Sequence, residues 1–326
     1  MSSTVLPTVS VVMPNYNHAE YLLRSLNAIV NQSVPPLELI VIDDCSTDNS
    51  ISILAEFAQK YSFVRYYRNE KNQGVVKTIN DGLDLAKGDY VYFPGADDEI
   101  CPGFFEKSLQ ILAKHPQAAL CCTIGDWYEV ASGWNWQVSV GMSDQPTYFS
   151  PDEIVQMERS CKFYMASHTT IFKRSALQEA GKFIPELRWY TDWFATHATG
   201  LRHGICYVPE KLALFYIYPT SYFTTGRAGR LAHREVLENL LNYCLRPDYA
   251  DILQPLRRSA ALYEFGLPVL RIILSRRKYW CFLTPLFLFK SLWHSIKLTG
   301  KKFMPKFVAE WYFQLAGYKV KSQPGG

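Results

Sequence analysis

The first hundred residues alternate between short apolar runs and amphipathic stretches, and this alternation limits the folds that the chain can adopt. Apolar, β-branched runs of strand length occur at 8–13, 37–42, 63–67 and 90–93. Between them apolar residues recur at helical spacing, as in Leu22, Leu26 and Ile29. Strands that alternate with helices favour a parallel sheet covered on both faces. The pattern therefore predicts an α/β fold with a doubly wound, mostly parallel sheet.

Polar and acidic residues follow three of the predicted strands. They are Pro14, Asn15 and Tyr16 after the first, Asp43 and Asp44 after the second, and Asp97 and Asp98 after the fourth. In open α/β sheets ligands bind outside the carboxyl ends of the strands. Adjacent carboxylates repel each other unless a cation lies between them, and oxygen ligands suit Mg²⁺ or Mn²⁺. We therefore expect a divalent metal, Mn²⁺ or Mg²⁺, bound mainly by Asp98 with Asp97 beside it.

Two common phosphate-binding motifs are missing from the sequence. No Gly-x-Gly-x-x-Gly follows the first strand, and no Gly-x-x-x-x-Gly-Lys occurs. A bound nucleotide would need its phosphates neutralised in another way, for which the metal is a candidate. The 8 cysteines form no Cys-x-x-Cys pair, which argues against a zinc site or a disulfide framework. The N-terminus lacks the pattern of a secretory signal, so we expect a cytoplasmic protein.

The last hundred residues differ in charge from the rest. Residues 1–226 hold 17 Lys and Arg against 24 Asp and Glu, whereas 227–326 hold 17 against 6. The apolar run 279–289 is shorter than the roughly 20 residues that a spanning helix needs, and Pro285 interrupts it. The basic and aromatic residues of 271–306 instead favour peripheral membrane contact by interfacial helices. A packed helical cap with a solvated basic face is the alternative, and the acidic sheet edge argues against nucleic acid as a partner.

Four ordered motifs of the chain resemble a known family. They are Pro14-Asn15-Tyr16-Asn17, the run 41–48 around Asp43-Asp44, Asn72-Gln73-Gly74, and Ala96-Asp97-Asp98. Together they are similar to the inverting glycosyltransferases of family 2, which have the GT-A fold, and the resemblance covers about 8–225. It implies a catalytic domain at 1–226, with a nucleotide-binding half at 1–120 and an acceptor and catalytic half at 121–226. A basic, aromatic, helical region then follows at 227–326.

The resemblance implies roles for the residues at the predicted sheet edge. Tyr16 would stack on the nucleotide base, and Asp44 would bind base or ribose with Asp43 next to it. The nucleotide site would also include Pro14, Asn15, Asn72 and Gly74. Asp97 and Asp98 would be the motif that binds metal and diphosphate. Many members have a further Asp where this chain has Gly95, so the metal depends mainly on Asp98.

Asp192 lies among aromatic residues at a predicted helix start. It is the only carboxylate between Glu186 and Glu210. From the residues alone Asp192 is better explained as a helix cap. The resemblance implies that it is the catalytic base, which takes the proton of the acceptor hydroxyl.

Three further residues are possible donor or acceptor contacts: His168, Trp189 and Ser221. His168 could equally be a core histidine, and Ser221 could simply begin a loop.

The resemblance predicts an enzyme that moves a sugar from a nucleoside diphosphate donor to a hydroxyl group. We expect a UDP-sugar as donor and a lipid-linked or saccharide acceptor, with the protein peripheral on the inner face of the membrane. Two alternatives remain open. One is a nucleotide-sugar-binding or membrane scaffold without turnover, and the other is a nucleotidyltransferase, which also uses paired Asp and a metal.

Overall fold

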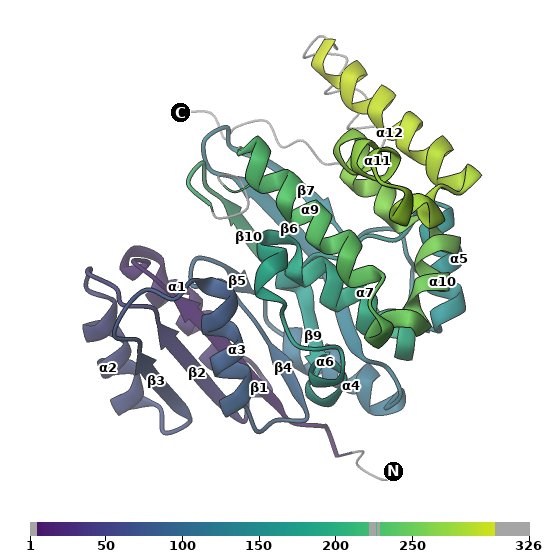
Figure 1. Ribbon diagram of the computed structural model, residues 1–326. Coiled ribbons are helices and arrows are strands. Elements are labelled where there is room, and N and C mark those ends of the chain that lie inside the picture. Colours follow the sequence, from purple (N-terminus) through teal and green to yellow (C-terminus); the bar gives the residue numbers. More distant parts are fainter. Residues whose placement is uncertain (1–4, 222–225, 227–228, 304–326) are drawn as a thin grey trace.

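The computed structural model describes residues 5–221, 226 and 229–303 (Figure 1). The predicted alternation is confirmed in the first hundred residues. The elements in order are β1 (Val9–Asn15), α1 (Ala19–Val30), β2 (Glu38–Asp43), α2 (Ser50–Lys60), β3 (Val64–Arg68), α3 (Val75–Leu85), β4 (Tyr90–Tyr92) and β5 (Glu99–Ile100).

The second half is less regular. It contains α4 (Phe104–Lys114), β6 (Leu120–Glu129), β7 (Trp134–Val138), β8 (Thr147–Phe149), α5 (Pro151–Arg159), η1 (Ser167–Thr169), β9 (Thr170–Lys173), α6 (Arg174–Glu179), η2 (Pro185–Tyr190), α7 (Thr191–His203) and β10 (Ile205–Ile217). Its strands join those of the first half in one sheet, so the two halves share a single framework.

The sheet has the strand order β3-β2-β1-β4-β9-β6-β10-β5, with β7 and β8 attached beside this path. Strands β1 to β4 pair in parallel, as predicted. Beyond them the sheet is mixed. Strand β9 runs antiparallel to both of its neighbours, β4 and β6, and β10 is parallel to β6 but antiparallel to β5 and β8. The sheet is mixed because β5, β7, β8 and β9 enter it in the reverse direction.

Helices cover both faces of the sheet, which agrees with a doubly wound arrangement. Val11 of β1 belongs to a core with α1, α2 and α4, whereas Val12 belongs to a second core with α3 and α7. Successive strand residues point to opposite faces, so one strand contributes to both cores. The carboxyl ends of β1 and β2 meet at one edge, where their register ends on Asn15 opposite Asp43.

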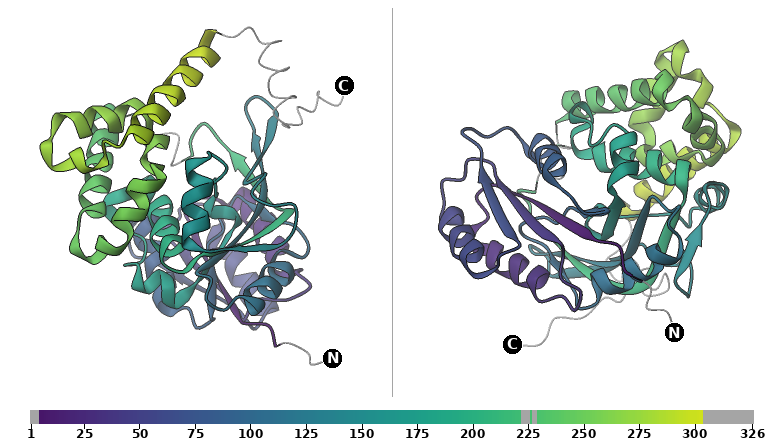
Figure 2. Two further views of the ribbon diagram at one scale, coloured as in Figure 1. Left: turned by 90° about the vertical axis from the view of Figure 1, so that its right-hand side faces the viewer. Right: turned by 90° about the horizontal axis from the view of Figure 1, so that it is seen from below.

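The C-terminal region is helical, as expected, and packs on the second half of the sheet domain (Figure 2). It contains α9 (Arg230–Cys244), η3 (Pro247–Tyr249), α10 (Ala250–Ser259), η4 (Ala261–Phe265), α11 (Gly266–Ser275), η5 (Arg277–Phe282) and α12 (Pro285–Phe303). Phe194 of α7 shares one apolar core with Leu240, Ile273 and Phe287 of this region. In the described part of the chain, none of the helices combines the length and apolar character that crossing a bilayer requires.

Candidate active site

Asp44 connects three segments at the carboxyl edge of the sheet. It lies just beyond β2 and is 3% exposed. Its Oδ1 accepts hydrogen bonds from Asn69 Nδ2 at 2.7 Å and from the Gln73 backbone N–H at 2.8 Å, and its Oδ2 accepts the Gly74 N–H at 2.8 Å. The 69–74 loop, which opens α3, is thereby fixed against the end of β2. The structure thus brings Asp44 next to the loop that contains Asn72 and Gly74, about thirty positions further along the chain.

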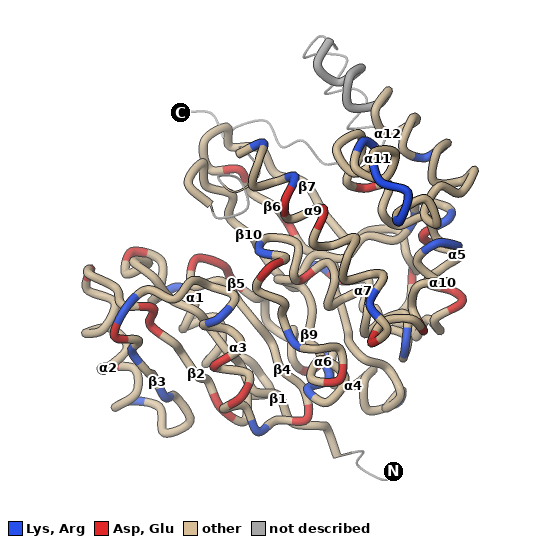
Figure 3. The backbone as a smooth tube through the Cα atoms, viewed as in Figure 1, with Lys and Arg blue, Asp and Glu red and all other residues tan. Residues whose placement is uncertain are grey.

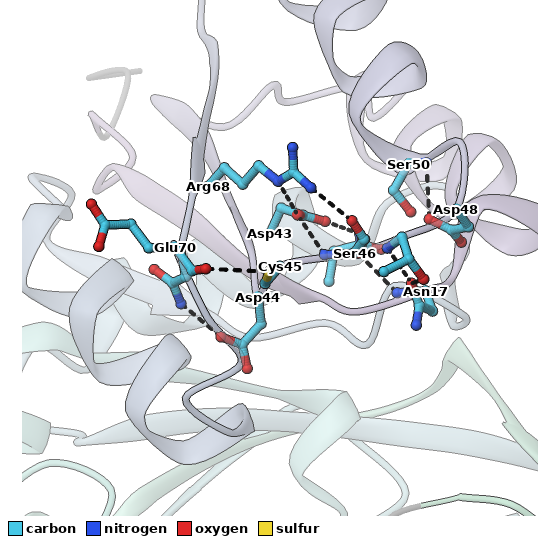
Figure 4. A network of polar contacts seen from close by, with 12 residues as sticks. Asn17, Asp43, Asp44, Cys45, Ser46, Asp48, Ser50, Arg68 and Glu70 are labelled. Carbon is cyan, nitrogen blue, oxygen red and sulfur yellow. Dashed lines mark hydrogen bonds and ion pairs between the residues drawn. The ribbon is translucent and has the colours of Figure 1, made fainter.

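Asp43 is fully buried and is surrounded by donors of the protein itself (Figure 4). Asn15 Nδ2 donates to Asp43 Oδ1 at 2.8 Å, and the Ser46 N–H donates to Oδ2 at 3.0 Å. Arg68 Nε lies 3.7 Å from the same Oδ2. Asp43 and Asn15 therefore hold the ends of β1 and β2 together, beneath the loops that border the candidate site. Their direct contact with a nucleotide stays a prediction.

Tyr16 presents an accessible aromatic ring beside this loop. It is 46% exposed and follows the buried Asn15 at the end of β1, next to Pro14. Asn17 adopts a left-handed backbone with φ of 56°. Asn17 Oδ1 accepts the Thr47 N–H at 2.7 Å, so this side chain fastens the 46–48 loop instead of capping α1. Tyr16 is consequently held between two fixed segments with its ring free for stacking.

Asp97 and Asp98 converge near the backbone of Gly95. A Cβ atom placed on Gly95 would lie 2.7 Å from both Asp97 Oδ1 and Asp98 Oδ2. Asp98 is 3% exposed, and its Oδ1 accepts the Tyr216 backbone N–H at 3.2 Å. Burial, and then the neighbouring Asp97 charge, raise the pKa of Asp98 well above its ordinary value. Gly95 is thus the residue that leaves room for the two carboxylates to approach each other.

Arg24, on α1, holds the acidic loop in place and is a residue that sequence reasoning missed. Its Nη2 donates to the Asp97 carbonyl oxygen at 2.8 Å, and its Nε lies 3.0 Å from Glu99 Oε1. The guanidinium also packs over the Tyr216 ring, 4.0 Å from its centroid. The only sequence signal was a single cation on a helix that borders an acidic crevice. Asn69, which donates a hydrogen bond to Asp44, had no such signal in the sequence.

The acidic pair has the chemistry that a hard divalent cation requires. Mg²⁺ is usually bound by one or two carboxylates together with substrate phosphates. Asp97 and Asp98 supply such a pair, and burial together with the Asp97 charge raises the pKa of Asp98. Among the described residues no three His, Cys, Asp or Glu side chains gather into a closed metal cage. The pair therefore fits a metal whose remaining ligands come from a bound diphosphate.

Asp192 lies in the first turn of α7 and is partly exposed. Its Oδ1 accepts the Trp193 backbone N–H at 2.7 Å. Burial raises the pKa of Asp192, while hydrogen bonds from Ser167 and Trp193 and the charge of His197 oppose that rise. A carboxylate with a raised pKa that still contacts solvent has the properties of a general base.

The three residues predicted as donor or acceptor contacts have different surroundings in the structure. His168 is 6% exposed, and burial lowers its pKa to about 3, so it is a neutral imidazole. Trp189 is 7% exposed, and the backbone of Gly226 lies against its ring. Ser221 accepts the Tyr218 N–H at 3.1 Å and closes a turn after β10. All three contacts stay predictions.

The sheet order, the two-sided helical cover and the acidic edge define an α/β protein of the GT-A class. The model of the family described as glycosyl transferase family 2 matches residues 10–181. This chain belongs to that family.

Known proteins of this class resemble much of the chain. The glycosyltransferase YibD of Escherichia coli K12 is 27% identical over 229 residues, which are 68% of this chain and 64% of YibD. A Campylobacter jejuni protein, GalNAc(5)-diNAcBac-PP-undecaprenol beta-1,3-glucosyltransferase, is 24% identical over 79% of this chain and 83% of its own length. Two other curated relatives are matched over less than half of their length, 44% and 42%. The crystal structure of S. aureus TarS 1–349 in complex with UDP superposes with a TM-score of 0.56 at 21% identity, covering 79% of this chain and 71% of TarS 1–349.

Proposed function

We propose that this protein is an inverting glycosyltransferase that moves a sugar from a nucleoside diphosphate donor, with UDP favoured, to a hydroxyl group of a lipid-linked or saccharide acceptor. The observation that carries the proposal is the meeting of Tyr16, the Asp44 loop and the Asp97-Asp98 pair at one sheet edge. An aromatic ring, a fixed polar loop and an acidic pair are what a nucleotide base, a ribose and a metal-bound diphosphate need.

The donor end of the site is preorganised. Asp44 already accepts three hydrogen bonds from the 69–74 loop, so the loop loses little conformational entropy when a nucleotide binds. Arg24 and Tyr216 fix the acidic loop from the opposite side. A divalent metal bound by Asp97 and Asp98 would supply positive charge to the leaving diphosphate. The structure of TarS contains UDP, which supports a UDP-sugar as the donor for this chain.

Asp192 would act as the general base. Its carboxylate takes the proton of the acceptor hydroxyl while the hydroxyl oxygen attacks the anomeric carbon. The bond from this carbon to the diphosphate oxygen breaks, and the nucleoside diphosphate leaves with the electron pair. A single displacement inverts the anomeric centre and needs no second nucleophilic carboxylate. The raised pKa of Asp192 makes it a stronger base than an exposed aspartate.

The C-terminal helices would hold the enzyme at a membrane surface. Large apolar side chains that are 51–66% exposed stand on α12: Phe289, Leu292, Trp293 and Ile296. Trp280 of η5 is 52% exposed, and basic residues of 271–278 lie beside these helices (Figure 3). Exposed rings next to cationic side chains suit an anionic bilayer interface. The polyprenyl-linked acceptor in the name of the Campylobacter jejuni relative agrees with this location.

Calorimetric titration with UDP, GDP and dTDP, each with and without Mn²⁺, tests the proposal. We expect Mn²⁺-dependent binding of one diphosphate, followed by its release from the matching nucleotide sugar when an acceptor is added. If a folded protein binds none of the three nucleotides, the glycosyltransferase proposal fails and a scaffold role is favoured. Consumption of a nucleoside triphosphate with release of pyrophosphate would instead indicate a nucleotidyltransferase.

A further inference from the structure

Four ionisable side chains from four elements form a buried cluster behind α7. They are Glu158 of α5, His197 of α7, Glu264 of η4 and Lys290 of α12. Three of them are almost fully enclosed, with exposed fractions of 1% for Glu158, 5% for His197 and 4% for Lys290. Burying ionised groups is costly unless they compensate one another. A cluster assembled from parts of the chain as distant as 158 and 290 therefore calls for an explanation beyond packing.

The hydrogen bonds fix the protonation state of His197. Its Nδ1 lies 2.8 Å from the Trp193 carbonyl oxygen, which can only accept, so Nδ1 carries a proton. Its Nε2 lies 3.0 Å from Glu158 Oε1, where a carboxylate also requires a donor. Burial lowers the pKa of His197, but the hydrogen bond and charge of Glu158, together with Glu264 and the Trp193 carbonyl, outweigh it and raise the pKa. Both ring nitrogens thus face oxygen atoms, an arrangement that suits an imidazolium.

Trp193 connects this cluster to the catalytic carboxyl. The indole ring stacks on the His197 ring with a centroid distance of 3.8 Å, and its Nε1–H donates to Glu264 Oε2 at 3.0 Å. The backbone N–H of the same residue donates to Asp192 Oδ1. The side chain, carbonyl and N–H of Trp193 are thus all engaged, two by the cluster and one by Asp192. A shift of the cluster would move the residue that orients the base.

Lys290 extends the cluster to the C-terminal region. Its Nζ donates to the Glu158 carbonyl oxygen and lies 3.4 Å from the Ser259 carbonyl oxygen and 4.3 Å from the centroid of the Tyr263 ring. Cys161 and Tyr263 are the other titratable groups facing it. On α12 Lys290 is on the face that packs inward, next to the buried Phe287 and Ser291, whereas Phe289, Leu292 and Trp293 are exposed.

We propose that Glu158, His197, Glu264 and Lys290 act together as positioning residues for Asp192, so that the seating of α12 sets the orientation and basicity of the catalytic carboxyl. The proposal rests on the role of Asp192 as general base. His197 and Lys290 are the cations that face the two buried carboxyls. Burial raises the pKa of Glu264 to about 7 and lowers the pKa of Lys290, so the charges of these groups depend on one another. His197 stacks on the ring of Trp193, and Glu264 accepts a hydrogen bond from its indole N–H. Lys290 of α12 bonds to the backbone of Glu158 and so connects α12 to α5.

Two substitutions test the proposal in the full-length protein, with UDP release from a panel of UDP-sugars as the assay and water as acceptor. His197→Gln removes the charge that opposes the raised pKa of Asp192, so the acid limb of the kcat/KM profile should move to higher pH. Lys290→Met leaves two carboxyls facing one cation, and kcat should fall by about tenfold or more, as small misplacements of catalytic groups do. The Kd for UDP should not change in either variant. Lys114→Met, at the exposed end of α4, is the matched control.

Compensation of charge separates positioning from simple damage. Adding Glu264→Gln to Lys290→Met restores one anion opposite one cation, and kcat should recover. An unmoved acid limb and wild-type kcat in folded His197→Gln and Lys290→Met would overturn the proposal. If Lys290→Met does not fold, His197→Gln alone decides.

A second readout does not require turnover. Nitrogen-15 spectra of labelled histidine should show His197 protonated at both ring nitrogens at neutral pH, and a singly protonated ring would contradict the cluster. If His197 is doubly protonated but the wild-type protein binds none of UDP, GDP and dTDP, the proposed function fails while the cluster stands.

Discussion

Asp44, at the end of β2, accepts the backbone N–H of Gly74, at the start of α3, over 2.8 Å. Together with the bonds from Asn69 and Gln73, this contact makes one carboxylate the anchor of the loop that borders the proposed nucleotide site. An amide cannot replace it, because Asn offers one acceptor oxygen and would turn donors toward donors.

We therefore predict that Asp44→Asn weakens UDP binding, measured by calorimetry. Leaving a charged hydrogen bond unmade costs about 1.5–3 kcal/mol, part of which should appear in the binding free energy. Asp81→Asn, on the exposed side of α3 where Asp81 pairs with Lys77, is the matched control and should bind UDP normally. Equal affinities of the two variants would show that the loop anchor does not serve the nucleotide.

Asp192→Asn should retain donor binding but lose transfer by about 10²–10⁴-fold, the usual contribution of a general base. In the wild-type protein activity requires the ionised carboxylate. Because burial raises the pKa of Asp192, activity should decline as the pH falls through a value above that of an ordinary aspartate. A pH profile of kcat/KM checks this. A profile without an acid limb would argue for another base.

Asp98→Asn should abolish Mn²⁺-dependent nucleotide binding and, without metal, make the fold more stable at pH 7. The folded-state pKa of Asp98 lies above its unfolded value, so the ionised side chain lowers stability at pH values above both, and this penalty disappears as the pH falls. Asparagine removes the charge and can still accept the Tyr216 N–H. Thermal unfolding measures the effect.

Asp89→Asn is the control of opposite sign for that experiment. Hydrogen bonds from the Thr8 backbone and side chain lower the pKa of Asp89, so its charge stabilises the fold at neutral pH and is lost as the pH falls. Its replacement should lower the melting temperature. If both substitutions change stability in the same direction, the explanation for Asp98 is wrong.

Gly95→Ala should disrupt the acidic pair. The new Cβ would meet two carboxylate oxygens at 2.7 Å, and such overpacking costs about 1–3 kcal/mol. We expect weaker Mn²⁺-dependent binding of UDP by calorimetry. Gly229→Ala, whose Cβ would meet its nearest neighbour at 3.7 Å, is the control. Unchanged binding in Gly95→Ala would mean that the approach of the two carboxylates is not needed.

Replacing both Phe289 and Trp293 by Ser should reduce binding to anionic vesicles of phosphatidylglycerol and phosphatidylcholine in a sedimentation assay. Burial of one aromatic ring contributes about 1.5–3 kcal/mol, so the loss should be at least tenfold, roughly. Leu231→Ser, at an 86% exposed leucine of α9, is the control. Added salt should weaken wild-type binding, and vesicle binding that survives the double substitution would assign the membrane contact elsewhere.

Much of the first half was predictable from the sequence because its signals are local. Each parallel strand reads as an apolar run, and the acidic pairs follow directly, so Asp43, Asp44 and Asp98 were found at the sheet edge. The second half was not, since the direction of β9 depends on its pairing with β4 and β6, which are distant in sequence. No local pattern reports strand direction.

Supporting residues were missed for the same reason. Arg24 acts through the Asp97 carbonyl 73 positions away, and alone it is typical of a solvated helix face. Lys290 contacts Glu158 across 132 positions, and the basic tail around it suggested only a surface role. Their functions depend on which backbone carbonyls and carboxyls the folded chain brings within reach.

The inward face of α12 ties the C-terminal helices to the interior of the catalytic domain. The family match ends at residue 181, yet Lys290 completes a charge balance that begins at Glu158 inside the matched region. The helices after β10 are thus not an interchangeable attachment. In this chain, replacing these helices would remove the cation that contacts the carbonyl oxygens of Glu158 and Ser259.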